Sequence, residues 1–357
     1  MKIVVTGATG NVGTATLRAL VADDSIDEIV GIARRTPAVW APHKVRWVAA
    51  DVSRDDLVPH FEGADAVVHL AWLLQPSRDQ EITDRANIHG SRRVFEAAAQ
   101  AGVGALIYAS SVAAYSPASP DAPVDESYPT FGIPGSYYSR QKVSVERILD
   151  GIERDHPELR VARARPGLIF QRSAAASIRR YFAGPLLPGW AVRRSLIPIV
   201  PRLTGLAGQL VHSDDVGELY RLLCVTPDAR GAYNVATQPP LDADALAHLL
   251  GARPVRLPVK ATRAAIKLSY LARLHPVSPD WLDVGLNVPL MKTDRAREEL
   301  GWSPVHDSGE TLLELMEGLR ANAGGPTPVL DAEAGGPLRI QEFLTGVGGP
   351  NPLDKRA

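Results

Sequence analysis

The amino-terminal two-thirds of the chain alternates short apolar runs with longer amphipathic stretches. The short runs predict strands at Lys2–Thr6, Glu28–Ala33, Val45–Ala49, Ala66–Leu70 and Ala105–Ala109, and a further strand fits Arg160–Arg165. Stretches with apolar residues three to four positions apart predict helices between them, notably at Asn11–Ala22, Ile82–Ala101 and Tyr138–Asp155. Strands that alternate with helices in this way predict an α/β protein with a doubly wound, mostly parallel sheet.

The pattern changes after about Phe170, where proline and glycine become dense. Gly184–Pro201 has no clean period, and further helices are expected at Ser213–Cys224, Asp242–Leu250, Ala261–Leu274 and Thr311–Ala321. We therefore expect a sheet domain over residues 1–170 and about 211–237, and a smaller substrate-binding lobe over residues 171–210 and 238–321. Residues 322–357 form a Gly/Pro-rich tail, which we expect to be loosely ordered.

A glycine-rich loop, Thr6-Gly7-Ala8-Thr9-Gly10-Asn11-Val12-Gly13, joins the first strand to the first helix. Gly7 permits a tight turn, Gly10 lets the backbone approach a pyrophosphate, and Gly13 permits close helix packing. The free N–H groups at the start of the helix favour an anion. This position in the chain predicts a dinucleotide-binding loop rather than an ordinary turn.

The end of the second strand bears on the choice of cofactor. An acidic residue there would hold the adenosine ribose 2′-hydroxyl, but the chain has Ala33, Arg34 and Arg35. Guanidinium groups pair with phosphate in a bidentate way, so the arginines favour a cofactor with a 2′-phosphate, NADP, over NAD. The alternative is a solvated arginine pair.

A tyrosine and a lysine stand four residues apart, at Tyr138 and Lys142, on one face of a predicted helix. A nearby ammonium favours the phenolate, so we expect Lys142 to lower the pKa of Tyr138 and make it usable as a general acid/base. Ser111 follows the fifth strand, at the sheet edge where ligands bind, and could hold a substrate hydroxyl or carbonyl by a hydrogen bond.

Together these motifs resemble the extended short-chain dehydrogenase/reductase family, also called the NAD-dependent epimerase/dehydratase family. The resemblance implies a Rossmann-type NAD(P)-binding domain, with Ser111 as catalytic serine, Tyr138 as acid/base and Lys142 as cofactor-binding lysine. It spans about residues 1–320 and includes the Arg165–Phe170, His212–Val216 and Glu299–Pro304 segments.

The resemblance also implies which residues contact the cofactor. Asp51 and Val52 resemble the pair at the adenine, and Leu70 and Ala71 resemble the loop that passes the cofactor. The full set of expected cofactor-binding residues is Gly7, Thr9, Gly10, Asn11, Val12, Gly13, Arg34, Arg35, Asp51, Val52, Leu70, Ala71, Asn87, Ala109, Tyr138, Lys142 and Pro166.

Departures from the family pattern narrow the chemistry. Val112 and Ala113 follow Ser111 where dehydratases of the family carry an acid, and Gly167 follows Pro166 without the asparagine of many nucleotide-sugar epimerases. An anionic substrate remains open through Arg179, Arg180, Arg193 and Arg194, whose alternative interpretation is solvated surface. The apolar residues expected around the pocket favour a small hydrophobic carbonyl or alcohol: Trp72, Leu73, Leu74, Tyr181, Phe182, Leu186, Leu187 and Trp190.

Composition limits the partners. The formal net charge is −1, which gives no reason to expect a nucleic acid or a membrane as partner. The single cysteine, Cys224, excludes an intrachain disulfide, and no cluster of histidine and cysteine has metal-binding spacing. No signal-peptide pattern or bilayer-length apolar run is present, so we expect a cytoplasmic protein with a small-molecule substrate.

Three functions follow in order of preference. The first is hydride transfer between NADP(H), or else NAD(H), and a secondary alcohol or ketone. The second is an NAD-dependent (nucleotide-)sugar epimerase with the same residues, and the third a dinucleotide-binding regulator without catalysis. The family resemblance further implies a homodimer through residues 82–101 and 138–155.

Overall fold

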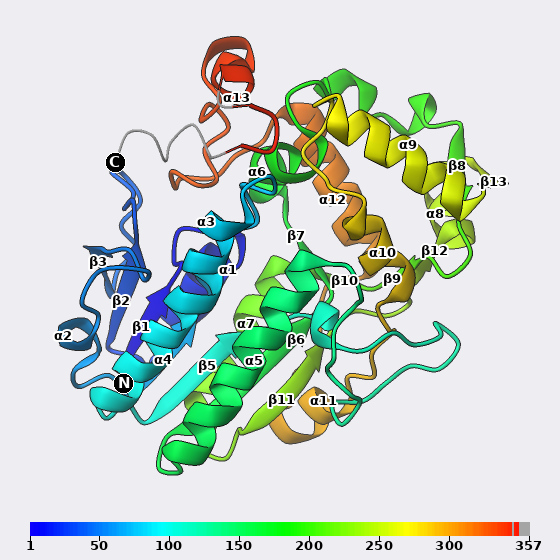
Figure 1. The fold of residues 1–357 in the computed structure, drawn as a ribbon. Helices are drawn as coiled ribbons and strands as arrows, with labels where there is room; N and C mark the ends of the chain where they lie inside the picture. The colour runs from blue at the N-terminus through cyan, green and yellow to red at the C-terminus, as the bar shows by residue number, and fades with distance from the viewer. Residues whose placement is uncertain (345, 350–357) are drawn as a thin grey trace.

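A seven-stranded parallel sheet forms the centre of the computed structural model, which describes residues 1–344 and 346–349 (Figure 1). The strand order is β11-β6-β5-β4-β1-β2-β3. The strands are β1 (Lys2–Thr6), β2 (Glu28–Ala33), β3 (Val45–Ala49), β4 (Ala66–His69), β5 (Ala105–Ala109), β6 (Arg160–Pro166) and β11 (Gly231–Val235). The expected doubly wound sheet is confirmed, and its order reverses between β1 and β4, the position where open α/β sheets bind ligands.

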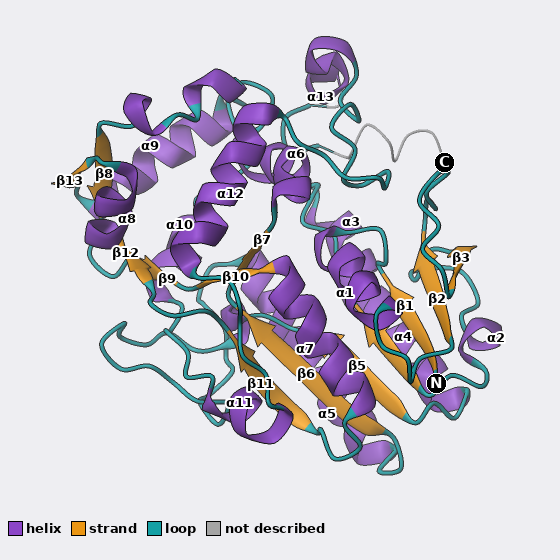
Figure 2. Cartoon of the chain, turned by 180° about the vertical axis from the view of Figure 1, so that it is seen from behind, coloured by secondary structure: helices purple, strands orange, loops and turns teal. Residues whose placement is uncertain are grey.

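Helices cover both faces of the sheet (Figure 2). One core packs the apolar sides of α1 (Asn11–Val21), α7 (Ser213–Val225) and α11 (Asp294–Leu300) against the strands. The other core packs α2 (Val58–Phe61), α4 (Gly90–Gln100) and α5 (Tyr137–Asp155) against the opposite face. Because both faces are covered, the central strands β1, β4 and β5 are nearly continuous apolar runs, whereas β6 carries three arginines.

The helix expected over Ile82–Ala101 is divided into three pieces. α3 (Gln80–Asp84) is followed by a π-helical turn, Arg85–His89, and then by α4. The buried Asn87 lies in this turn, where its amide bonds both the N–H and the carbonyl of Leu73. Such single π-turns often mark functional sites, and this one fastens the loop that follows β4.

Outside the seven-stranded sheet, the structure has further helices and three two-stranded sheets, most of them within residues 171–210 and 238–321, here called the smaller lobe. The helices are α6 (Ala175–Ile178), α8 (Ala243–Leu250), α9 (Val259–Leu271), α10 (Asp280–Asn287) and α12 (Ser308–Ala321). The sheets pair β7 (Leu168–Phe170) with β10 (Leu210–His212), β9 (Ala207–Gly208) with β12 (Leu241–Asp242), and β8 (Ile199–Arg202) with β13 (Arg253–Arg256). Residues 184–201, which have no clean period, contain short 3₁₀ turns and the start of β8.

The carboxyl-terminal tail differs from its expected loose order over the residues that the structure describes. It continues from α12 past α6 to the short helix α13 (Ile340–Leu344), drawn orange to red in Figure 1. Thr327 and Leu330 are each 1% exposed. The Arg180 side chain donates to two backbone carbonyls of the tail, so tertiary contacts order this segment despite its Gly/Pro-rich composition.

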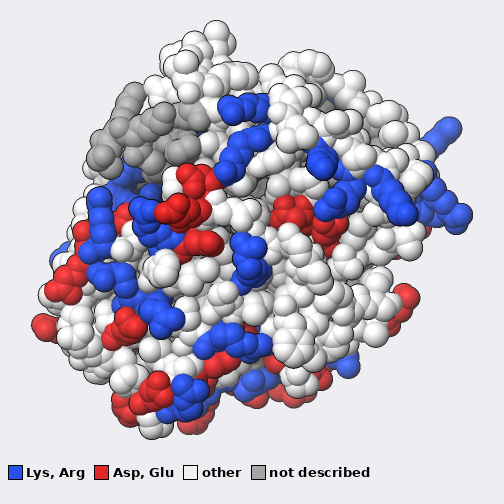
Figure 3. Space-filling model, viewed as in Figure 1, with Lys and Arg blue, Asp and Glu red and all other residues white. Residues whose placement is uncertain are grey.

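Charged side chains of both signs are mixed over the lower part of the face in Figure 3, in keeping with the net charge of −1. Within residues 1–344 and 346–349, no helix is both long and apolar enough to cross a membrane. The same residues contain no cluster of three or more His, Cys, Asp or Glu side chains that could hold a metal ion.

Candidate active site

The glycine-rich loop has the geometry that its sequence predicts. Gly7 has φ +72°, and a Cβ there would lie 2.6 Å from the backbone nitrogen of Ala71. A Cβ on Gly13 would lie 2.7 Å from the carbonyl carbon of Ala8. The Gly10 N–H donates to the Gly7 carbonyl at 3.0 Å, and Gly10 caps α1 without a side chain. The loop therefore leaves the start of α1 open to an anion.

A pocket of about 420 Å³ opens beside this loop. Most of the expected cofactor-binding residues line it: Gly7, Thr9, Gly10, Arg34, Arg35, Asp51, Val52, Leu70, Ala71 and Asn87. Sequence reasoning did not place Gln75, Arg85 or Val329 there. Val329 lies far along the chain, in the tail, so no local signal pointed to it.

Three residues of the loop face elsewhere. The Asn11 amide donates to the Ile169 carbonyl at 3.1 Å and accepts hydrogen bonds from Gln171 and Ser213. Val12 packs against the sheet core. None of Asn11, Val12 and Gly13 lines the pocket wall. The Asn11 side chain holds the loop on β7 and α7, so these three residues offer a phosphate only their backbone N–H groups.

The two arginines that follow the second strand lie at the pocket. Arg34 and Arg35 follow β2 and line the pocket together with Asp51 and Val52, which follow β3. The Asp51 carboxylate accepts hydrogen bonds from the N–H and hydroxyl of Ser53, at 2.9 and 2.7 Å. The adenosine end of a dinucleotide would therefore meet two guanidinium groups at this end of the pocket.

Ser111, Tyr138 and Lys142 come together at the carboxyl end of β5. Ser111 begins a 3₁₀ turn and accepts a hydrogen bond from the Ala113 N–H at 3.1 Å. Tyr138 and Lys142 come from the first turns of α5, and Tyr138 is within hydrogen-bonding reach of Ser111. The ammonium of Lys142 donates to the Ala109 carbonyl at 2.7 Å, which links the helix to the end of β5.

The expected lowering of the Tyr138 pKa is wrong for this structure. Burial raises the pKa of the phenol above its ordinary value, and the hydrogen bond to Ser111 only opposes that rise. The Lys142 nitrogen lies 6.0 Å from the centre of the Tyr138 ring, and it donates instead to the Ala109 carbonyl and the Tyr108 hydroxyl. Tyr138 therefore keeps its proton at neutral pH, as a proton donor must.

The Lys142 ammonium instead lies on the face of the Trp72 indole, 3.4 Å from the ring centre. Burial lowers the pKa of Lys142 well below its ordinary value, and the Glu146 carboxylate one helical turn away opposes the shift. Trp72 also lines the dinucleotide pocket. The lysine is thus held at the boundary between pocket and catalytic residues.

An aromatic cluster surrounds Tyr138. Its ring lies 6.0 Å from that of Trp72 and 4.9 Å from that of Trp281, and Trp281 meets Phe182 edge-on at 5.2 Å. Trp72 and Phe182 were expected near the pocket, whereas Trp281 of α10 was missed because nothing in its local sequence marks it. Leu186 and Trp190 are 52% and 64% exposed and do not line the pocket.

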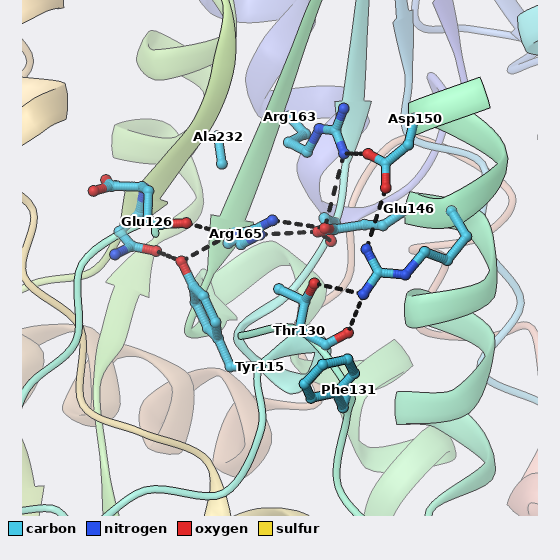
Figure 4. Close-up of polar contacts among 12 residues, drawn as sticks. Tyr115, Glu126, Thr130, Phe131, Glu146, Asp150, Arg163, Arg165 and Ala232 are labelled. Carbon is cyan, nitrogen blue, oxygen red and sulfur yellow. Dashed lines mark hydrogen bonds and ion pairs between the residues drawn. The ribbon is translucent and has the colours of Figure 1, made fainter. Parts of the chain in front are cut away.

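A buried ionic network joins α5 to β6 (Figure 4). Arg165 of β6 pairs with Glu146 of α5 through two hydrogen bonds, of 2.9 and 2.6 Å, and Glu146 is 1% exposed. Arg165 also donates to the Tyr115 hydroxyl at 3.0 Å, and Ser110 donates to Glu146. These contacts fix α5 against β5 and β6 and so position Tyr138 and Lys142.

His69, at the end of β4, is buried between two hydroxyls. Its ring nitrogens lie 2.7 Å from the Thr6 hydroxyl and 2.9 Å from that of Ser91. Burial lowers the pKa of His69 to about 3, with a smaller contribution from the positive charge of Lys142. The imidazole is therefore a neutral structural group that joins β1, β4 and α4.

We expect this histidine to make the folded state sensitive to acid. Unfolded histidine titrates near pH 6.5, so between pH 6.5 and 3 the unfolded chain binds the extra proton. The free energy of unfolding should fall with decreasing pH in that range, by up to about 1.4 kcal/mol per pH unit from this group. Urea unfolding measured from pH 7 to pH 4 should show that the free energy of unfolding falls less steeply for His69→Asn than for the parent protein. For the control His43→Asn, whose side chain is exposed, it should fall as steeply as in the parent. Equal slopes for all three proteins would contradict the assignment.

The fold and site define an NAD(P)-binding protein of the Rossmann type. Residues 3–236 match the model of the NAD dependent epimerase/dehydratase family. The chain belongs to this family.

Individual relatives extend the comparison. An uncharacterized protein of Mycobacterium tuberculosis strain H37Rv is 27% identical over 326 residues, 91% of this chain and 31% of that protein. An L-arabinose 1-dehydrogenase (NAD(P)(+)) of Haloferax volcanii is 37% identical over 110 residues, 30% of this chain and 40% of that protein. The chain thus spans about a third of the length of the mycobacterial relatives that it matches.

Among solved structures, the UDP-glucose 4-epimerase of Thermus thermophilus, in complex with NAD, superimposes with a TM-score of 0.64. The two chains are 20% identical, and the match covers 90% of this chain and 99% of the epimerase. This likeness supports the fold.

Proposed function

We propose that the protein is an NAD(P)-dependent oxidoreductase that interconverts a secondary alcohol and a ketone. The observation that carries the proposal is the arrangement of Ser111, Tyr138 and Lys142 at the end of β5, beside a pocket that contains the phosphate loop. When bound, the nicotinamide cofactor supplies or accepts the hydride.

Each residue of the trio has a defined task. Tyr138, whose pKa burial raises, holds a proton to give to the substrate oxygen. Ser111 orients that oxygen by a hydrogen bond. Lys142, held by the Ala109 carbonyl and the Trp72 ring, provides positive charge at the boundary with the cofactor pocket. The aromatic rings of Trp72 and Trp281 exclude water from the phenol.

The pocket residues fit a dinucleotide. The loop around Gly7 and Gly10 would bind the pyrophosphate through backbone N–H groups, and Asp51 and Val52 would border the adenine. Ala109 and Pro166 lie at the ends of β5 and β6, on the nicotinamide side of the proposed site. We propose NADP as the preferred cofactor, because Arg34 and Arg35 line the adenosine end where an acidic residue would select NAD.

We expect Arg35→Ala and Arg34→Ala to weaken NADPH binding by about 10- to 100-fold, because each removes charge-assisted hydrogen bonds to a 2′-phosphate. NADH binding should change little. Fluorescence titration with both nucleotides measures the effect, after identification of any nucleotide that co-purifies. Arg46→Ala, a surface arginine of β3 outside the pocket, is the control. A preference of the parent protein for NADH would overturn the NADP assignment.

An NAD-dependent sugar epimerase is the second candidate, and the likeness to a UDP-glucose 4-epimerase favours it. Such an enzyme would use the same trio but retain its cofactor through the cycle. NAD that co-purifies tightly with the protein would favour the epimerase, whereas an empty, exchangeable site would favour the reductase. The homodimer through residues 82–101 and 138–155 stays a prediction.

A further inference from the structure

The tail crosses the phosphate loop, a placement that neither the family match nor the cofactor motifs explain. The family model ends at residue 236. We call residues 323–344, which follow α12, the strap. Its Thr327 hydroxyl donates to the carbonyl of Thr9, in the phosphate loop, at 2.7 Å. Val329, two residues on, lines the dinucleotide pocket together with Thr9 and Gly10.

The part of the strap at the pocket is a compact turn. The Gly325 N–H donates to the Leu330 carbonyl at 2.9 Å, and the Leu330 N–H donates to the Thr327 carbonyl at 3.0 Å. Leu330 is 1% exposed. A Cβ on Gly324 would lie 2.5 Å from the Ala332 nitrogen, so the turn closes tightly at that residue. The turn presents Thr327 and Val329 to the loop as a fixed unit.

Two consecutive buried arginines hold the strap on the smaller lobe. Arg180 donates to the carbonyls of Asp331 and Val329, at 2.8 and 2.7 Å. Arg179 pairs with Glu342 through two hydrogen bonds of 3.0 and 2.6 Å, and both side chains are under a tenth exposed. The expectation that Arg179 and Arg180 bind an anionic substrate, or lie solvated on the surface, is therefore wrong in this structure.

We propose that the strap is part of the dinucleotide site and slows release of the cofactor, with Thr327 and Val329 as positioning residues. This inference rests on the proposed function, because it concerns the same pocket. A ligand that fills the pocket contacts the strap only while the strap lies against the phosphate loop, as it does in this structure. Docking and cofactor binding must therefore strengthen each other by the same free energy. Breaking a strap contact should speed cofactor release, and bound cofactor should protect the strap.

The first experiment measures NADPH dissociation in a stopped-flow chase with excess NADP. Thr327→Val removes the hydroxyl donor while it keeps the side-chain shape, and should speed release about fivefold. Glu342→Gln breaks the anchor at a distance from the pocket and should also speed release. The control Thr262→Val removes a hydroxyl that likewise bonds a backbone carbonyl, but in α9 and outside the pocket wall. Its rate should equal that of the parent protein.

The second experiment reads the reciprocal effect by hydrogen exchange. The amides of Gly325 and Leu330 should exchange more slowly with NADPH than without it, and this protection should diminish in Glu342→Gln. If Glu342→Gln does not fold, the exchange of these amides with and without NADPH is compared between the parent protein and Thr327→Val.

The outcomes separate the two proposals. If no version of the protein binds NADPH or NADH, the proposed function fails. If all versions bind, but the strap variants release NADPH at the parent rate and the strap amides exchange equally with and without cofactor, the strap inference is overturned and the oxidoreductase proposal stands.

Discussion

Tyr138→Phe should lower kcat by about 10²- to 10⁴-fold while dinucleotide binding stays within about twofold of the parent. The substitution removes only the hydroxyl, which is the proton donor proposed to act with Ser111, and Tyr138 is not part of the pocket wall. The ring stays in place between Trp72 and Trp281, so the aromatic cluster is preserved. Steady-state kinetics on a substrate found by screening ketones, together with NADPH titration, measure both effects.

The neighbouring tyrosine provides a matched control. Tyr137 lies on the same helix, and its hydroxyl donates to the Leu74 carbonyl at 3.4 Å. Tyr137→Phe should cost the hydrogen bonds of this hydroxyl to Leu74 and Trp281 but keep its ring, and should lower kcat by no more than about fivefold. If Tyr138→Phe kept turnover comparable to that of Tyr137→Phe, the acid/base assignment would be wrong.

Glu146→Gln should reduce the free energy of unfolding by about 3–5 kcal/mol, because it leaves the buried Arg165 guanidinium without its counter-charge. Arg165 holds the pKa of the Glu146 carboxyl below its usual range despite burial, so the pair is ionised in the folded protein. Urea unfolding at pH 7 measures the loss as a shift of the midpoint. Activity should fall as well, because the pair positions α5.

Two further variants isolate the cause. Glu153→Gln removes a carboxylate that also pairs with a β6 arginine, Arg163 at 2.8 Å, but this carboxylate is 36% exposed. Its cost should be below about 1 kcal/mol. The double change Glu146→Leu with Arg165→Met removes both charges and should be more stable than Glu146→Gln. Equal losses for Glu146→Gln and Glu153→Gln would contradict the buried-pair account.

Residues that act within one element were predictable from the sequence. The phosphate loop depends on the conformations that Gly7 and Gly13 permit over a few residues, and the four-residue spacing of Tyr138 and Lys142 fixes their common face. The strands of the sheet, apart from β11, were expected from the sequence, and their alternation with helices predicts a parallel, doubly wound sheet. The order of the strands, in which β4 lies beside β1, came only from the structure. The relative positions of the Ser111, Tyr138 and Lys142 side chains could not be predicted from the sequence.

Only the tertiary structure decided contacts between distant segments. Burial raises the Tyr138 pKa, where helical spacing alone suggested a lowering by Lys142. Trp281 reaches the phenol from α10, and Thr327 reaches Thr9 across more than 300 residues of chain. Local propensity carries no information about such partners, because they depend on which surfaces meet once the sheet and lobe have packed. The sequence by itself thus determined the family and the fold, whereas long-range packing decided how the candidate site is enclosed.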